Sequence, residues 1–208
     1  MSSKLQHMPV SSAERSFDRN ALLSPLMPTL RRGVRIAEVK ATAKQISADP
    51  DSIAALLDML RNPEEYASVQ IQKGAWLLHH AFQLDERSFL QYRAELGAVL
   101  DATEDPSALR ELLKLLASPI WTDVETEDQR TDLLELGLGM LHLTDLSLAI
   151  SYTAMQLVQS RAASVAEYRE GLVGLQTLRA RWGDENQPLH RCIVRYESRF
   201  RAQVKRLK

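Results

Sequence analysis

The sequence predicts an all-α protein, and three observations support this. Glycine and proline are scarce, with 8 of each among 208 residues, which leaves little turn chemistry for a sandwich or barrel of many short strands. Leucine and alanine, which favour helices, number 33 and 23. Apolar residues recur at helical spacing, and no run of β-branched residues alternates with a period of two.

The chain divides into a short lead-in and one domain. Serines and prolines interrupt any helical period in residues 1–32, so we expect a mobile lead-in there. The apolar run at 21–30 contains two prolines, and two arginines follow it instead of preceding it, which is not the pattern of a secretory signal. Residues 33–208 are regularly patterned and predict a single helical-repeat domain. The lone Cys192 fits a cytoplasmic protein, and no apolar run approaches the about 18 residues of a membrane span, so no membrane partner is expected.

Capping signals mark where the helices begin. Asp49, Asn62 and Asp105 each precede a proline, so a capping side chain stands next to a residue whose φ is preset for the first turn. Asn62 and Ser164 are each followed three residues later by glutamate, which is the spacing of a capping box. The predicted helices span 34–47, 50–61, 63–83, 86–101, 106–118, 127–142, 146–160, 165–181 and 188–206.

These starts repeat at an interval. The start at Asn62 recurs 43 residues later at Asp105, and the start at Leu146 follows 40 residues after Pro106. Two helices in about 40 to 47 residues is the period of HEAT and armadillo repeats. We therefore predict a right-handed α-α superhelix, a HEAT- or armadillo-like solenoid of about four to five helix pairs, each buried against its neighbours. Glycines expected at close helix crossings are Gly97, Gly137, Gly139, Gly171 and Gly174.

Several segments resemble a family of short bacterial HEAT-like proteins of the Bacteroidetes type. GAWLLHH at 74–80 resembles the family's A-A-W-x-L-D-H helix turn, and QYRAEL at 91–96 resembles its L-x-P-Y-L-P-x-L partner helix. SALRELLKLLAS at 107–118 and YTAMQL at 152–157 resemble its R-R-x-L-L-K-L-L and V-F-A-M-Q-V-L helices. The resemblance extends over about residues 50–208 and implies a HEAT-like fold.

The chain departs from that family at two points. His79 stands where the family has aspartate, and the prolines of the partner helix are absent. Members of the family are sometimes labelled adenylosuccinate lyase. The signature loop of that enzyme, S-S-x-M-P-x-K-x-N, does not occur in the sequence, and 208 residues are few for its long helical bundle. The resemblance therefore implies no lyase activity.

The sequence contains no complete catalytic or metal-binding pattern. Trp76 and His80 are four residues apart and share a helix face beside His79, where an imidazole could bind a metal or transfer a proton. A zinc site needs at least three protein ligands, and neither H-E-x-x-H nor a second pair to match His190 and Cys192 is present. Core packing is the favoured interpretation of these side chains. We therefore predict no enzyme, no metal and no cofactor.

Charge is unevenly distributed along a chain whose formal net charge is −1. Residues 101–137 hold ten acidic and three basic side chains, whereas residues 161–208 hold eleven basic and five acidic ones. Arg191, Arg195 and Arg199 recur every four residues on the last predicted helix and would attract phosphate or an acidic protein. The alternative is a solvated outer face on a terminal capping helix.

Two functions of different class follow from this pattern. A stack of helix pairs offers a long surface to an extended segment, so the leading prediction is a non-enzymatic protein–protein interaction scaffold with a protein or peptide partner. The alternative is a nucleic-acid-binding protein with a fold like that of HEAT-like DNA glycosylases, which would use the basic last helix. The residues expected to bind, on the concave side and on the last helix, are Tyr92, Tyr168, Arg169, Arg191, Arg195 and Arg199, with Trp76 and His80 as further candidates.

Overall fold

The computed structural model describes residues 36–143, 147–182 and 188–208, and these ranges contain helices and connecting segments but no strand. The prediction of an all-α protein is confirmed for this part of the chain, whereas the predicted lead-in, 1–32, lies outside it. The α-helices are α2 (Ile36–Ala48), α3 (Pro50–Arg61), α4 (Ser68–Leu84), α5 (Arg93–Ala102), α6 (Pro106–Leu116), α7 (Glu127–His142), α8 (Leu148–Arg161), α9 (Val165–Trp182) and α10 (Pro188–Arg206). Short 3-10 helices are η2 (Pro63–Glu65), η3 (Glu86–Tyr92) and η4 (Pro119–Asp123).

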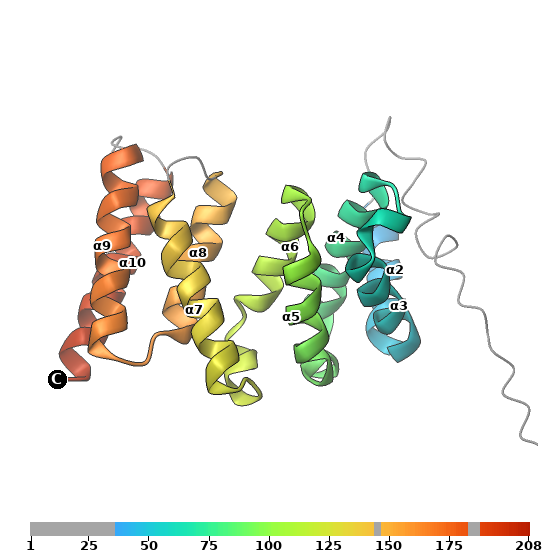
Figure 1. Cartoon of the computed structure of the whole chain (residues 1–208), viewed down its shortest axis with the longest axis horizontal. Coiled ribbons are helices and arrows are strands. Elements are labelled where there is room, and N and C mark those ends of the chain that lie inside the picture. Colours follow the sequence, from blue (N-terminus) through green and yellow to red (C-terminus); the bar gives the residue numbers. More distant parts are fainter. Residues whose placement is uncertain (1–35, 144–146, 183–187) are drawn as a thin grey trace, which may run out of the picture.

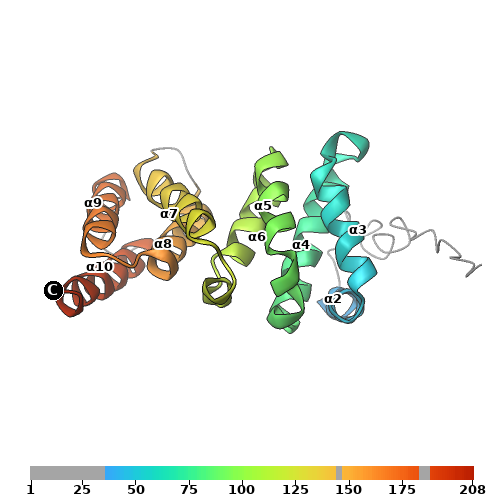
Figure 2. The same ribbon diagram turned by 60° about the horizontal axis from the view of Figure 1, so that its bottom comes forward.

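The helices form two layers (Figure 1). Helices α2, α4, α6, α8 and α10 make one layer, in which each packs against the next. In the second layer α3 packs against α5 and α7 against α9, and Figure 2 shows this layer lying above the first. Consecutive helices join the layers, as α3 does with α4, α7 with α8 and α9 with α10. Successive helices of the first layer begin 32, 38, 42 and 40 residues apart, so only the last two intervals fall within the expected 40 to 47 residues.

Capping side chains start several helices where the sequence predicts. Asp49 accepts a hydrogen bond from the amide of Asp51 at the start of α3. The Asp105 carboxylate accepts from the amides of Ser107 and Ala108 at the start of α6. The predicted capping box at Ser164 forms at the start of α9. Each of these contacts satisfies an amide that has no partner within its helix, so local chemistry fixes the helix start.

The predicted start at Asn62 is wrong. The Asn62 side chain turns back and donates to the carbonyl and carboxylate oxygens of Asp58, so it closes α3 instead of opening a helix. Only the three-residue η2 follows, and α4 begins at Ser68, where the side chain of Gln70 accepts from the amide of Ala67. The predicted helix 86–101 divides into η3 and α5, and α8 begins at Leu148 after the cap Ser147.

The predicted close crossings occur at some of the glycines. A Cβ on Gly174 would lie 2.7 Å from the Cβ of Leu141, and one on Gly171 would lie 2.8 Å from the Phe200 ring. Both glycines therefore allow α9 to approach α7 and α10 closely. Gly139 has no atom within 4 Å of an added Cβ and Gly97 has only the end of an arginine at 3.5 Å, so the expectation is wrong for these two.

A buried ion network connects the two halves of the stack, α2–α6 and α7–α10. Glu125, between η4 and α7, has a side chain only 1% exposed. Its carboxylate oxygens accept from Arg93 of α5 at 2.9 Å and from Arg161 of α8 at 2.8 and 2.9 Å. Arg161 also donates to the carbonyls of Leu116 and Ser118 at the end of α6, at 2.7 and 3.2 Å. The network fastens α8 to the end of α6, where the two halves meet.

Candidate binding surface

Three of the predicted binding residues do not form a common surface. Tyr92 lies in the N-terminal half, where its hydroxyl donates to the carbonyl of Pro50 at 3.2 Å. Tyr168 of α9 is 6% exposed and its ring packs on that of Phe200, with 5.5 Å between centroids. Its neighbour Arg169 is exposed. Tyr168 is therefore placed in the core, because the turn that carries it faces α10, and not on the concave binding surface where the sequence predicts it.

Trp76 and His80 lie on α4, in the other layer, and both are half-buried. Their rings meet edge to face at 5.0 Å, and the ammonium of Lys73 lies 5.1 Å from the centre of the indole. Burial, and then the neighbouring His79, lower the pKa of His80. Trp76 thus packs against Lys73 and His80 of its own helix, and it also lines a hollow between α4 and α6.

A carboxylate held by cations lies between α4 and α6. Glu111 has a side chain only 5% exposed, and its oxygens lie 2.9 Å from His79 Nδ1 and 3.0 Å from both Arg110 Nε and Lys114 Nζ. Burial by itself raises the pKa of Glu111, but the hydrogen bonds from His79 and Lys114 outweigh burial and lower the pKa to about 2. Glu111 is therefore ionised at neutral pH. Its negative charge balances only one of the two positive charges of Arg110 and Lys114.

Two hollows lie on either side of this cluster. The first, of about 240 Å³, lies between α4 and α6, and the second, of about 410 Å³, reaches from α4 and α6 to α8. Among the described residues, the lining of the second contains Lys114 and His79 but no Asp or Glu. The first is lined by Gln72, Lys73, Trp76, Ser107, Arg110 and Glu111, and the second by His79, Gln83, Lys114, Ala149, Tyr152, Thr153 and Gln156.

The arginines of α10 extend the same layer. Arg191 and Arg195 are exposed, and Arg199 donates to the side chain of Gln159 on α8 at 2.9 Å. Burial and then Cys192 raise the pKa of Tyr152, and the charge of Arg191 opposes them. The charge of Arg191 therefore acts on a tyrosine that lines the second hollow. We give the name basic face to the two hollows together with the exposed arginines of α10, and its cations are Lys73, Arg110, Lys114, Arg191, Arg195 and Arg199.

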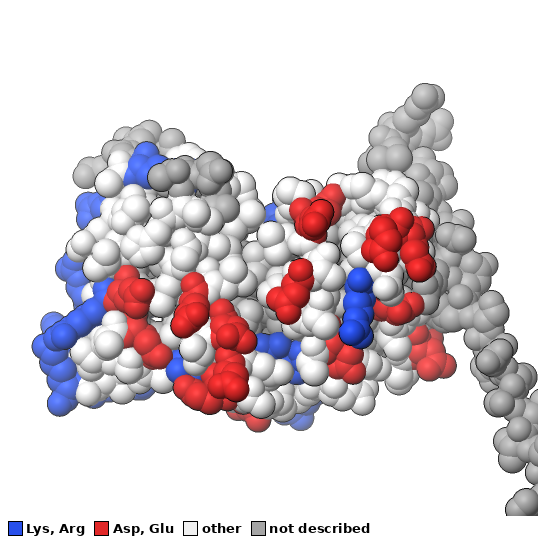
Figure 3. Space-filling model, viewed as in Figure 1, with Lys and Arg blue, Asp and Glu red and all other residues white. Residues whose placement is uncertain are grey.

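The two layers differ in charge. Helices α2, α4, α6, α8 and α10, the basic layer, contain twelve Lys and Arg and three Asp and Glu. Helices α3, α5, α7 and α9, the acidic layer, contain ten Asp and Glu and six Lys and Arg. Figure 3 shows acidic side chains spread over the face of the acidic layer, with basic ones gathered at the end where α10 lies. Charge is thus unevenly distributed between the two layers as well as along the sequence. The net charge of the whole chain is nevertheless only −1.

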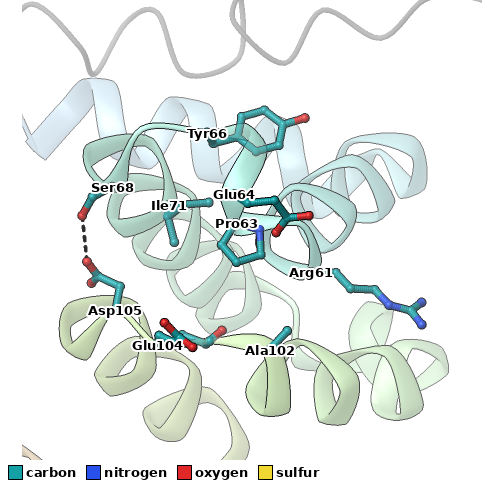
Figure 4. A pocket seen from close by; sticks show the side chains of 10 residues that line it. Arg61, Pro63, Glu64, Tyr66, Ser68, Ile71, Ala102, Glu104 and Asp105 are labelled. Carbon is teal, nitrogen blue, oxygen red and sulfur yellow. Dashed lines mark hydrogen bonds between the residues drawn. The ribbon is translucent and has the colours of Figure 1, made fainter.

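A third hollow, of about 500 Å³, lies at the loops before α4 and α6 (Figure 4). Its lining includes Glu64, Glu104 and Asp105. Asp105 accepts hydrogen bonds from Ser68 and Gln72 in addition to the two amides that it caps. Burial raises the pKa of Asp105, but these hydrogen bonds prevail and lower it. Asp105 thus joins α4 to the start of α6, which is a structural role.

Sequence reasoning missed Lys73, Glu111, Lys114 and Tyr152 as members of this surface. The spacing of Glu111 and Lys114, three residues apart on one helix, was a usable signal for an ion pair. The sequence contains no comparable signal for the contact between His79 and Glu111, because the two residues are 32 positions apart. In the described ranges no group of three or more His, Cys, Asp or Glu side chains is arranged to hold a metal ion. Nor does any helix described there have the length and apolar character needed to cross a membrane.

Comparison with known proteins gives no match. The chain matches no protein-family model, no curated protein and no solved structure. The resemblance to short HEAT-like proteins therefore stays a prediction, and the function must be argued from the surface itself.

Proposed function

We propose that this protein is a non-catalytic scaffold that binds an extended acidic segment of another protein along its basic face. The observation that carries the proposal is the division of charge between the layers, twelve basic and three acidic side chains in one against six and ten in the other. An acidic segment is attracted to the basic layer and repelled by the acidic layer. The charges therefore determine which layer the partner binds as well as which kind of partner binds.

The shape of the basic face supports an extended ligand. The two hollows follow one another from the α4–α6 contact to α8, and the cationic stripe of α10 lies beyond them. A stack of helix pairs, which we propose forms a right-handed HEAT-like superhelix, exposes such a row of helices along its length. Binding in this manner needs no catalytic group, which agrees with the sequence interpretation of a protein without enzymatic activity.

Nucleic acid is the second candidate, and one observation favours it. Trp76 and Tyr152 place aromatic rings among the cations of the basic face, where bases could stack. The net charge of −1 argues against it, since the acidic layer opposes the long-range attraction of a densely charged polyanion. The hollows are also lined by glutamine, threonine and tyrosine, whose mixed donors and acceptors suit a polypeptide backbone. An acidic protein segment is therefore the preferred partner.

Fluorescence anisotropy with labelled decaglutamate tests the proposal. We expect salt-sensitive binding, weakened about tenfold or more by Lys73→Gln/Arg110→Gln/Lys114→Gln, because three partly exposed charge contacts are each worth up to about 1 kcal/mol. The matched control, Arg61→Gln/Arg87→Gln/Arg169→Gln, removes the same charge elsewhere and should bind like the wild type. No binding at low salt, or equal loss in both triple variants, contradicts the proposal. Tighter binding of single-stranded or duplex DNA would favour the second candidate.

A further inference from the structure

We propose that the hollow of about 410 Å³ between α4, α6 and α8 is a subsite for one carboxylate side chain, glutamate or aspartate, of the bound segment. The inference rests on the proposed function and assigns a chemical class to one position of the ligand. It is carried by the charge balance around Glu111 and by the polar groups that line the hollow.

Within the described part of the chain, the cationic cluster beside the hollow has one more basic than acidic side chain. Arg110 and Lys114 both donate to Glu111, so the three side chains together carry a charge of +1. The Lys114 ammonium contacts both Glu111 oxygens, at 3.0 and 3.2 Å, and its side chain remains 34% exposed. An ammonium has three N–H donors, so it can also serve a second carboxylate. Glu111 orients Lys114 without neutralising the cluster, and a ligand carboxylate at the hollow would complete the charge balance.

The α8 side of the hollow offers neutral hydrogen-bonding groups. Tyr152 and Gln156 are four residues apart and therefore share a face of α8, beside Thr153 and Ala149. The Thr153 hydroxyl already donates to the Ala149 carbonyl, which leaves its oxygen as an acceptor. The hollow thus places an ammonium on one wall and neutral polar groups on the other, and no Asp or Glu is found among the lining residues that the structure describes. A monoanion matches this arrangement in charge, whereas a phosphate dianion exceeds the charge of the cluster.

Chemical-shift titration of the full-length, ¹⁵N-labelled protein tests the subsite with N-acetylglutamate N-methylamide as the probe. We expect saturable shifts of backbone amides in 110–114 and 149–156, and none with the uncharged N-acetylglutamine N-methylamide. Ala149→Phe should abolish the shifts because it fills the hollow without changing any charge. Leu148→Phe is the matched control, since Leu148 is exposed and does not line the hollow.

The outcomes separate the subsite from the proposed function. Absence of saturable shifts in the wild type, or unchanged binding to Ala149→Phe, overturns the subsite even where decaglutamate binds. Shifts without any decaglutamate binding support the subsite and reject the extended segment. Tighter binding of N-acetylphosphoserine N-methylamide overturns the assignment to a carboxylate. If Ala149→Phe fails to fold by circular dichroism, Lys114→Gln replaces it, and unchanged binding to that variant overturns the subsite equally.

Discussion

Glu125→Ala should be among the most destabilising single substitutions in this protein. The wild-type carboxylate is 1% exposed and forms three ionic hydrogen bonds of 2.8 to 2.9 Å. Its removal leaves the guanidinium groups of Arg93 and Arg161, 7% and 0% exposed, close together without a counter-charge. Removing one partner of a buried ion pair typically costs about 3–5 kcal/mol. Because two charges are stranded here instead of one, we expect a loss in the upper part of that range.

Urea unfolding followed by circular dichroism measures this loss, and thermal unfolding gives a second readout. For a chain of this size 1 kcal/mol corresponds to about 2–4 °C, so a loss of about 4–5 kcal/mol should lower the midpoint by roughly 8–20 °C. The control is Glu127→Ala, which removes a carboxylate 74% exposed that pairs with Arg130 and should leave both transitions nearly unchanged. A loss below about 1 kcal/mol for Glu125→Ala would refute the reasoning, because it would mean that the network does not hold the halves together.

Three further predictions concern stability. The pKa of Glu111 is lowered from 4.5 to about 2, so its contribution is present above about pH 4.5 and is lost as the pH falls through about 2. Between about pH 5 and pH 2 the wild type should thus lose up to about 3 kcal/mol more unfolding free energy in urea titrations than Glu111→Gln, and equal losses would contradict this. Gly139→Ala should increase the unfolding free energy by up to about 1 kcal/mol and raise the thermal midpoint, whereas Gly174→Ala should lower both because its Cβ would meet Leu141. The opposite order would be inconsistent with the packing. Asp105→Ala should cost about 1–2 kcal/mol in urea unfolding through loss of the α6 cap, and no loss would show that water replaces it.

The helices could be predicted well where a local side chain decides their start. Asp49, Asp105 and Ser164 each cap a helix within three residues of their own position, so the sequence alone contains the interaction. Asn62 shows the limit of this reasoning. Its side chain has two competing uses, to cap the following turn or to bond backward to Asp58, and the second prevails. Sequence spacing cannot rank these uses, because both are local and both satisfy a polar group.

The candidate surface could be predicted only in part, for a different physical reason. Trp76 lines a hollow of the basic face, whereas Tyr168 is almost fully buried, because an aromatic residue on an amphipathic helix serves equally well in the core. Glu111 stands among leucines on α6, where Arg110 and Lys114 of its own helix and His79 of α4 all bond to it. Only the contacts within α6 have a signature in the sequence of that segment, because the partner from α4 is distant along the chain.

The ion network and the proposed carboxylate subsite share the contact between α6 and α8. Arg161 fastens the end of α8 to the carbonyls of Leu116 and Ser118, and the hollow lies between Lys114 of α6 and Tyr152 of the same α8. The separation of its two walls is therefore fixed by the helices that the network joins. A buried ion pair contributes little net stability compared with an apolar contact of the same size. Its directional hydrogen bonds, however, fix the register of one helix against another, which is what a site divided between the two halves requires.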